Sequence, residues 1–380
     1  MRRNDLTVRL GLSRSATGAV LEELRALRLI AVETSPPPAG TAGRPSHLVL
    51  AHPAGPVVVA VQIRARAYRV GLVGIGGTVV TSSVRTLPRP PTPERVLAAV
   101  ASSVVDVLRL TPRPCIGLGV AVPSAVSRAD ERALAALYLD WPPSVPVMET
   151  LTGLLDDAGA TVAVHVGNDA NLAALAEHRH GAGTGASDML FVTTAARGVG
   201  GALVTGGHLF TGSAGYALEV GHITVEPRGR LCHCGNRGCL DVEADPLALL
   251  PEPMARGLAA DDDVEAPARG IVRAAATDPE ARAAVRRVSD RLGGALAALV
   301  NLFNPDRIVL GGLFADVWAA MPERLAETVR RRSFLDAASQ VPIVPAALGE
   351  DAILLGAGEL ALQPVLDDPR CLPGRTGGGA

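Results

Sequence analysis

A histidine and three cysteines within one short stretch constrain this chain more than any other feature. His222 is followed by Cys232, Cys234 and Cys239, so the spacing is His-x9-Cys-x-Cys-x4-Cys. Five cysteines occur in 380 residues, so three unrelated buried thiols in one cluster are the weaker interpretation. One imidazole and three thiolates supply the four ligands of a closed tetrahedral zinc site. The pattern predicts structural zinc, with His233 as the alternative to His222.

The composition is that of a globular chain. It is 48% hydrophobic and only 3% aromatic, which indicates an aliphatic core. It contains no run of about 18 apolar residues and no apolar signal-peptide core, so we expect a cytoplasmic protein without a membrane partner. All 36 basic residues are arginine, which excludes a phosphate-binding or Schiff-base lysine. The net charge of −2 restricts nucleic-acid contact to a local basic element.

The first 50 residues have the pattern of a winged helix-turn-helix. Residues 3–29 are predicted to form two short helices around a turn at 11–13, with Ser13 as the N-cap of the second helix. Two strands follow, at 30–33 and 46–50, and a Pro/Gly-rich loop separates them. The helix that usually precedes this pair is missing. We therefore expect a partial DNA-binding domain over residues 1–52.

From residue 57 on, apolar strands and amphipathic helices alternate, as in an α/β fold. The predicted strands are 57–63, 68–73, 79–84, 116–122, 162–166, 189–193, 201–204 and 307–310. The predicted helices are 93–110, 145–158, 170–180, 269–276 and 279–302. Residues 56–362 are expected to form one unit that carries the zinc site, and residues 363–380 a flexible tail.

Several motifs together resemble the ROK family (repressor, open reading frame, kinase). They are Glu219–His222 with the cysteine cluster and its Gly-Cys-Leu-Asp end, Gly167–Asn171, Gly198–Gly201, and Asn304-Pro305 before Val309–Gly312. The resemblance extends with gaps from about residue 6 to residue 362. It implies a duplicated actin-like (ribonuclease-H-like) fold of two lobes with a sugar cleft between them, as a homodimer or homotetramer. Members of this family are either sugar kinases or sugar-responsive repressors with an N-terminal winged helix.

The resemblance also implies roles for the cleft residues. Asn168 and Glu219 would bind sugar hydroxyls, and Asp169 occupies the position of the kinases' general base. His222 would contact sugar with one ring nitrogen and zinc with the other. Asp241 stands where the family has the longer Glu, so its sugar contact would have a shorter reach. Judged by residue type alone, the alternatives are a helix-capping pair at Asn168-Asp169 and a solvated Glu219.

One departure from the kinase pattern affects the phosphate site. The kinases carry Asp-x-Gly-x-Thr on their first strand, whereas the matching stretch here is Gln62–Arg66. Without the carboxylate, Mg²⁺ loses a hard oxygen ligand, and without the glycine the backbone cannot approach a phosphate closely. Gly74–Thr78 lies one strand later and also lacks the Asp, and Gly198–Gly201 is more typical of a hairpin. We therefore expect no enzyme activity, with Asp169 as a vestigial base.

Three further departures lie near the cleft. Tyr138 stands where the family usually has Asn, Ser124 follows Pro123 where Gly is usual, and Leu218 replaces a Gly before Glu219. A tyrosine in place of an asparagine changes both size and hydrogen bonding. The ligand is therefore expected to differ from the common hexoses and N-acetylated sugars, or to be lost.

The N-terminal 50 residues have a local net charge of +3, because they contain seven arginines and four acidic residues. In a helix-turn-helix the start of the second helix enters the major groove, so Arg14, Ser15 and Thr17 are the predicted DNA contacts. Arg44 lies in a Gly-Arg-Pro segment that resembles the family's wing and would reach a phosphate or the minor groove. The alternative is that these are ordinary solvated side chains.

The sequence thus predicts a DNA-binding transcriptional regulator, more specifically a repressor, that binds operator DNA and responds to a sugar or sugar phosphate. An ATP-dependent sugar kinase is the main alternative, since Asp169 is retained. A degenerate ROK protein without ligand is the second.

Overall fold

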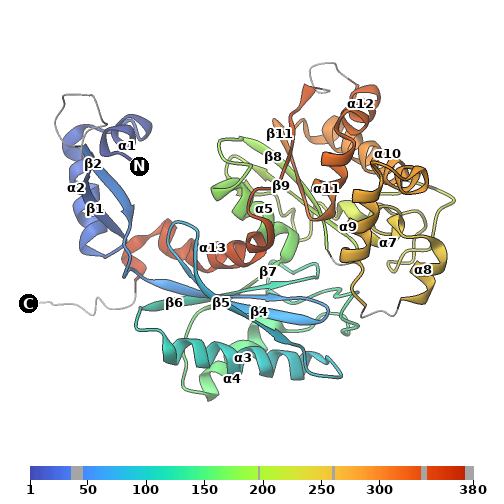
Figure 1. Cartoon of the computed structure of the whole chain (residues 1–380). Coiled ribbons are helices and arrows are strands. Elements are labelled where there is room, and N and C mark those ends of the chain that lie inside the picture. Colours follow the sequence, from blue (N-terminus) through green and yellow to red (C-terminus); the bar gives the residue numbers. More distant parts are fainter. Residues whose placement is uncertain (36–45, 196, 259–261, 335–339, 373–380) are drawn as a thin grey trace, which may run out of the picture.

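The structure is a computed structural model of an N-terminal unit followed by two lobes (Figure 1). It describes residues 1–35, 46–195, 197–258, 262–334 and 340–372.

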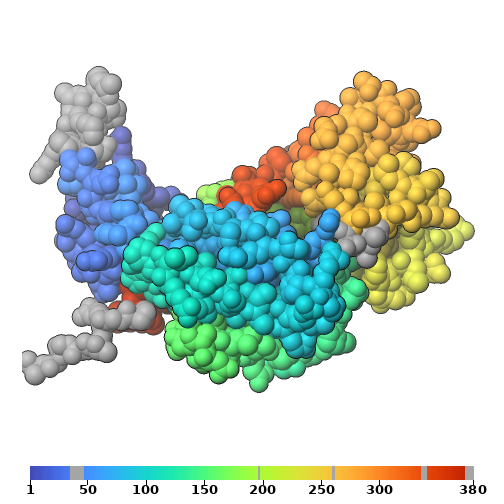
Figure 2. All heavy atoms as spheres, turned by 60° about the horizontal axis from the view of Figure 1, so that its bottom comes forward, coloured from blue at the N-terminus to red at the C-terminus, as the bar shows by residue number. Residues whose placement is uncertain are grey.

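The N-terminal unit contains two helices and a strand pair. These are α1 (Arg3–Arg9), α2 (Arg14–Ala26) and the antiparallel strands β1 (Ile30–Ser35) and β2 (Ser46–Ala51). Ser13 caps α2 as predicted, because its hydroxyl accepts a hydrogen bond from the Ala16 N–H at 3.1 Å. The unit has few buried apolar side chains, chiefly Leu21 and Leu29, while Val20 of α2 is 41% exposed. Figure 2 shows this unit, in blue, at one end of the molecule.

The first lobe is built on a five-stranded mixed sheet with the order β5-β4-β3-β6-β7. Its strands are β3 (Val57–Ile63), β4 (Ala67–Gly74), β5 (Thr78–Thr86), β6 (Cys115–Val122) and β7 (Val164–Asn168). The β3–β4–β5 pairs are antiparallel, and β6 and β7 continue parallel to β3. Helices α3 (Pro93–Leu110) and α4 (Val147–Asp157) pack against one face. β3 is buried along its whole length because both faces are covered, which explains its unbroken apolar run.

The second lobe repeats this topology, with the strand order β10-β9-β8-β11-β12. Its strands are β8 (Asp188–Thr194), β9 (Val199–Thr205), β10 (His208–Leu209), β11 (Arg307–Gly311) and β12 (Ile343–Pro345). Again three antiparallel strands precede two parallel ones. The expected duplicated, two-lobed α/β fold is therefore present.

The helices of the second lobe surround its sheet and the cysteine-rich loop. They are the 3-10 turn η1 (Val220–His222), α6 (Leu240–Glu243), α7 (Pro246–Leu249), α8 (Glu252–Gly257), α9 (Glu265–Ala274), α10 (Pro279–Phe303), α11 (Leu313–Ala320) and α12 (Pro322–Arg332). None of the helices in the described ranges is long and apolar enough to cross a membrane.

Two helices join the lobes. α5 (Asp169–His180) and α13 (Ala352–Asp367) pack together on the face of the first sheet opposite α3, and α5 also contacts β9 of the second sheet. A Cβ at Gly119 of β6 would lie 1.8 Å from the Ala357 carbonyl oxygen of α13, so only glycine permits this close approach. Two short 3-10 turns, η3 (Gly349–Asp351) and η4 (Pro369–Cys371), flank α13. α13 continues to Asp367, beyond the predicted boundary at residue 362, so the ordered unit is longer than expected.

Candidate functional site

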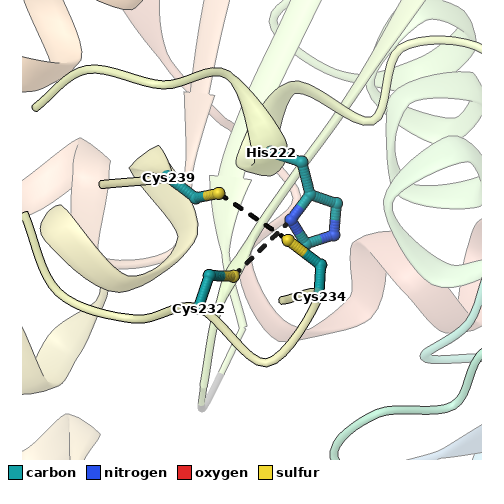
Figure 3. Close-up of side chains that lie close together, drawn as sticks. All are labelled: His222, Cys232, Cys234 and Cys239. Carbon is teal, nitrogen blue, oxygen red and sulfur yellow. Dashed lines mark hydrogen bonds between the residues drawn. The ribbon is translucent and has the colours of Figure 1, made fainter. Parts of the chain in front are cut away.

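The histidine and three cysteines converge at the edge of the second lobe (Figure 3). His222 lies in η1, Cys232 and Cys234 lie in the following loop, and Cys239 precedes α6. The loop folds back sharply at Gly238, which has φ +66° and whose Cβ would lie 1.6 Å from the Glu226 carbonyl oxygen. Glycine is therefore required at this turn.

The four side chains fit a tetrahedral metal site. Their ligand atoms all lie within 4.8 Å of one another. The Cys234 and Cys239 sulfurs are 3.8 Å apart, as are the Cys232 sulfur and His222 Nδ1. Zn–S bonds of about 2.3 Å in a tetrahedron place two sulfurs roughly 3.8 Å apart. The cluster is therefore consistent with a zinc site, and it contains all four predicted ligands.

His233, the alternative fourth ligand, lies outside this cluster. It is exposed, and its ring makes an edge contact with Tyr138 at a centroid distance of 5.3 Å. Spacing alone did not distinguish the two histidines, because both lie within reach of the loop. The fold of η1 places the His222 ring among the sulfurs.

A buried carboxylate fastens the cysteine-rich loop to the rest of the lobe. Glu243 is 2% exposed and accepts a hydrogen bond from the Arg230 N–H at 2.7 Å. The same side chain forms an ion pair of 2.6 Å with Arg291 of α10. The position of the cysteines is therefore coupled to the long helix of the second lobe.

Asn168 and Asp169 lie at the junction of β7 and α5, where the capping role is confirmed. The Asn168 side-chain oxygen accepts a hydrogen bond from the Asn171 N–H at 2.9 Å, and its amide donates to the Ser124 carbonyl at 3.1 Å. Asp169 accepts a hydrogen bond from the Ala170 N–H at 2.8 Å. All three groups therefore make hydrogen bonds within the protein and contribute to the fold.

Asp169 and Glu219 form an acidic pair whose charges repel. Burial raises the pKa of Asp169 to about 6, the Ala170 N–H opposes this shift, and the nearby Glu219 carboxylate adds to it. The Glu219 side chain is open to solvent, yet the surrounding protein still raises its pKa by desolvation. His222 opposes that shift and Asp241 adds to it. Carboxylates held in this way can accept hydrogen bonds from a vicinal diol.

The predicted sugar contact of Asp241 is not available in this structure. Asp241 is 4% exposed, and its Oδ1 accepts a hydrogen bond from the Val199 N–H at 2.8 Å. Its Oδ2 accepts one from the Tyr138 hydroxyl at 2.6 Å. The expectation was wrong because Tyr138, a hundred residues earlier in the chain, covers the carboxylate. A sequence signal existed, since both positions depart from the family pattern, but it did not show that the two side chains meet.

The β3–β4 hairpin carries Gln62–Arg66, the stretch that the sequence comparison matched to the kinases' phosphate motif. Its turn is closed by a hydrogen bond from the Arg64 N–H to the Ala67 carbonyl at 2.8 Å. Gln62 is 4% exposed and accepts a hydrogen bond from the Arg64 guanidinium at 2.8 Å. Gly198 has φ +85° in the β8–β9 hairpin, in agreement with the hairpin interpretation of that turn.

The predicted DNA contacts divide into three groups. Arg14 and Ser15 are exposed at the start of α2. Thr17 is only 1% exposed and its hydroxyl donates to the Ser13 carbonyl, so it faces the interior of the unit and cannot touch DNA as predicted. Arg44 lies outside the described residues.

Two lobes of repeated topology, with acidic side chains at their junction and a Cys₃His loop at one edge, define a two-lobed protein of the actin-like class. The chain belongs to the ROK family, whose model matches residues 58–364.

Relatives of two kinds are similar to it. The xylose repressor of Caldicellulosiruptor bescii is 29% identical over 268 residues, which span 68% of this chain and 65% of that protein. A ROK family glucokinase from Streptomyces griseus, solved with glucose and AMPPNP, is 28% identical with a TM-score of 0.68 and covers 81% of this chain and 99% of its own. A ROK family transcriptional regulator, a homologue of the E. coli MLC protein, is 22% identical with a TM-score of 0.74 and covers 97% of this chain and 92% of its own. At this identity, the likeness to the transcriptional regulator shows a shared fold.

Replacing Asp169 by asparagine is expected to stabilise the protein at high pH. The folded-state pKa of about 6 exceeds the ordinary 3.8, so the stability that this carboxyl contributes is fully present below pH 3.8 and is lost as the pH rises through 6. Such a shift corresponds to at most about 3 kcal/mol, and solvent contact reduces this to about 1–2 kcal/mol. Denaturant unfolding should therefore show Asp169→Asn more stable than the wild type at pH 8, but not at pH 4.

The exposed Asp106 of α3 provides the control for this measurement, since Asp106→Asn makes the same chemical change at a solvent-exposed position. A pH-independent effect of Asp169→Asn would contradict the raised pKa.

Proposed function

We propose that this chain is a carbohydrate-responsive, DNA-binding regulator of the ROK family that works in the cytoplasm as a homodimer or homotetramer. The observation that carries the proposal is the β3–β4 turn. Gln62 and Arg64 bond to each other there, where a kinase needs a carboxylate for its metal and a glycine for the phosphate. A guanidinium cannot hold Mg²⁺, and the neutral Gln62 amide oxygen, which is already bonded to Arg64, is a poor substitute for the carboxylate that Mg²⁺ prefers. The cleft therefore suits a carbohydrate better than a transfer reaction.

The N-terminal unit supports the DNA-binding part of the proposal. Its two helices, turn and strand pair have the order of a winged helix-turn-helix, and the regulator of similar fold covers 97% of this chain whereas the glucokinase covers 81%. Arg14 and Ser15 are the described residues available at the start of α2 to meet the major groove.

A physical route from cleft to DNA is available through α13. It packs on the first sheet and on α5, which begins at Asp169, and its far end lies beside the N-terminal unit (Figure 1). There Arg370 lies close enough to Glu23 of α2 for their charges to interact. Ligand binding that moves the lobes would shift this helix and change the spacing of two DNA-binding units in a dimer.

Zinc would be held by His222, Cys232, Cys234 and Cys239 in a structural role. The four protein ligands leave no coordination position for water, so the ion would supply stability to the loop and no chemistry. His222 Nδ1 faces Cys232 at 3.8 Å, and His222 also interacts with the Glu219 charge. The imidazole would therefore orient Glu219 toward the ligand from the zinc side.

A sugar kinase is the second candidate, and one observation favours it. Asp169 has a pKa of about 6, within the range useful for taking a proton from a sugar hydroxyl near neutral pH. Release of ADP with any monosaccharide, lost in Asp169→Asn, would establish the kinase in place of the regulator.

DNA binding tests the proposal directly. Fluorescence anisotropy with a palindromic operator, obtained by selection with the full chain, is expected to show binding that weakens with salt and changes with one sugar of a panel. Arg14→Ala should weaken binding and reduce the salt slope by about one, because one phosphate or base contact is lost. Arg25→Ala, an exposed arginine of the last turn of α2, is the matched control. Failure to select any operator would count against the regulator.

A further inference from the structure

The Asp241 carboxylate is taken up by the chain itself. Tyr138 donates its hydroxyl proton to Oδ2 at 2.6 Å, and the Val199 N–H donates to Oδ1 at 2.8 Å. With 4% exposure, Asp241 has no open side for a ligand hydroxyl. A ligand in this part of the cleft meets the phenol of Tyr138 in place of a carboxylate.

The Tyr138 ring is held by contacts from two other segments. The β8–β9 turn lies against it, since a Cβ at Gly198 would be 2.8 Å from ring atom Cε2 and 2.6 Å from Asp241 Oδ1. His233 of the cysteine-rich loop makes an edge contact at an interplanar angle of 68°. Burial and the Asp241 charge raise the pKa of the Tyr138 phenol far above its ordinary value, so the hydroxyl remains a donor at every physiological pH. The ring is therefore fixed by contacts with Asp241, His233 and Gly198.

Two further carboxylates, Asp169 and Glu219, belong to the predicted sugar site. The Glu219 carboxylate helps to raise the pKa of Asp169, and the Asp241 carboxylate helps to raise the pKa of Glu219. The acidic group thus spans Asp169, Glu219 and Asp241, and Tyr138 removes the last of the three from use. A sugar can satisfy a diol at the first two, whereas a further hydroxyl near Asp241 would meet the Tyr138 ring and only the neutral phenol oxygen as an acceptor, in place of a carboxylate.

We propose that Tyr138 sets the ligand specificity of this cleft by withholding Asp241 and presenting an aromatic ring. The ligand is a sugar that lacks one hydroxyl at the carbon facing Tyr138, either through deoxygenation or through a shortened carbon chain. This inference rests on the proposed carbohydrate site.

Matched pairs of sugars provide the test. Isothermal titration would compare D-glucose with D-xylose and 2-deoxy-D-glucose, and D-galactose with D-fucose, on the wild type, Tyr138→Asn and Tyr138→Ala. The wild type should bind at least one deoxy or shortened sugar about tenfold or more tightly than its parent, because the parent hydroxyl would exchange its water contacts for an aromatic ring and one neutral acceptor. Both variants uncover Asp241 and should reverse that preference. Two variants are used, with zinc content and circular dichroism as folding checks.

Tyr68→Phe is the matched control, because Tyr68 is a buried tyrosine whose hydroxyl contacts Ser103 at 2.7 Å and the Ala99 carbonyl at 3.1 Å, both in α3. It should leave the sugar ranking unchanged. The same ranking in the wild type and in both Tyr138 variants would overturn the specificity role while leaving the carbohydrate site intact. If neither the wild type nor any variant showed binding to any sugar of the panel, both the specificity role of Tyr138 and the carbohydrate site would be overturned.

Discussion

Replacing Cys239 by serine should release zinc and destabilise the second lobe by several kcal/mol. Cys239 is fully buried, precedes α6 and lies 3.8 Å from the Cys234 sulfur. The loop has almost no apolar core of its own, since the cluster there comprises Cys232, Cys239 and Val242. Structural zinc contributes about 10–16 kcal/mol of apparent binding free energy, which becomes folding free energy. We therefore expect the metal, together with the Glu243 contacts, to hold this loop more than the burial of apolar surface does.

Elemental analysis and calorimetry measure the two consequences. The wild type should carry about one zinc per chain and Cys239→Ser almost none, with a fall in unfolding temperature on the order of 10 °C. Cys371→Ser is the matched control, because Cys371 is exposed near the end of the described chain, outside the cluster. A Cys239→Ser protein that keeps its zinc and its unfolding temperature would contradict the site.

Neutralising both available carboxylates of the cleft should abolish ligand binding. Hydrogen bonds to charged groups contribute about 1.5–3 kcal/mol each, so Asp169→Asn with Glu219→Gln should weaken the affinity for the ligand by at least about 150-fold. The pair changes charge but hardly changes volume, so the fold should persist. The ligand is the sugar with the strongest wild-type titration signal in the panel above, and titration of the double variant is the measurement.

A double variant on the outer face of the first lobe separates this effect from a change in total charge. Glu94→Gln with Asp106→Asn removes the same two charges from exposed positions of α3 and should leave the affinity unchanged. Equal losses in the two double variants would show that overall charge, and not the cleft, determines binding.

Local spacing was enough to predict those parts of the site that lie close together in the chain. The zinc ligands fall within residues 222–239, and a chain that short with glycines at its turns has few ways to place four donors apart. The alternation of apolar strands and helices predicted the α/β class, and most helix bounds agree to within a few residues, as for α3 at Pro93–Leu110. Ser13 as the cap of α2 was likewise a local, correct prediction.

Contacts between distant segments were decided by the tertiary structure alone. Tyr138 and Asp241 are 103 residues apart in the sequence, and their side chains meet beside Gly198 of the β8–β9 turn. Thr17 faces inward because it lies on the same side of α2 as Leu21, the side that packs against the rest of the unit. The sequence of α2 alone did not specify which side of the helix would be buried. The sequence by itself determined which polar and metal-binding side chains are present and which contacts they could make with residues nearby in the chain. Packing of the two lobes decided which of them remain available to a ligand, since a hydrogen bond made within the protein removes an acceptor that residue type alone would count as free.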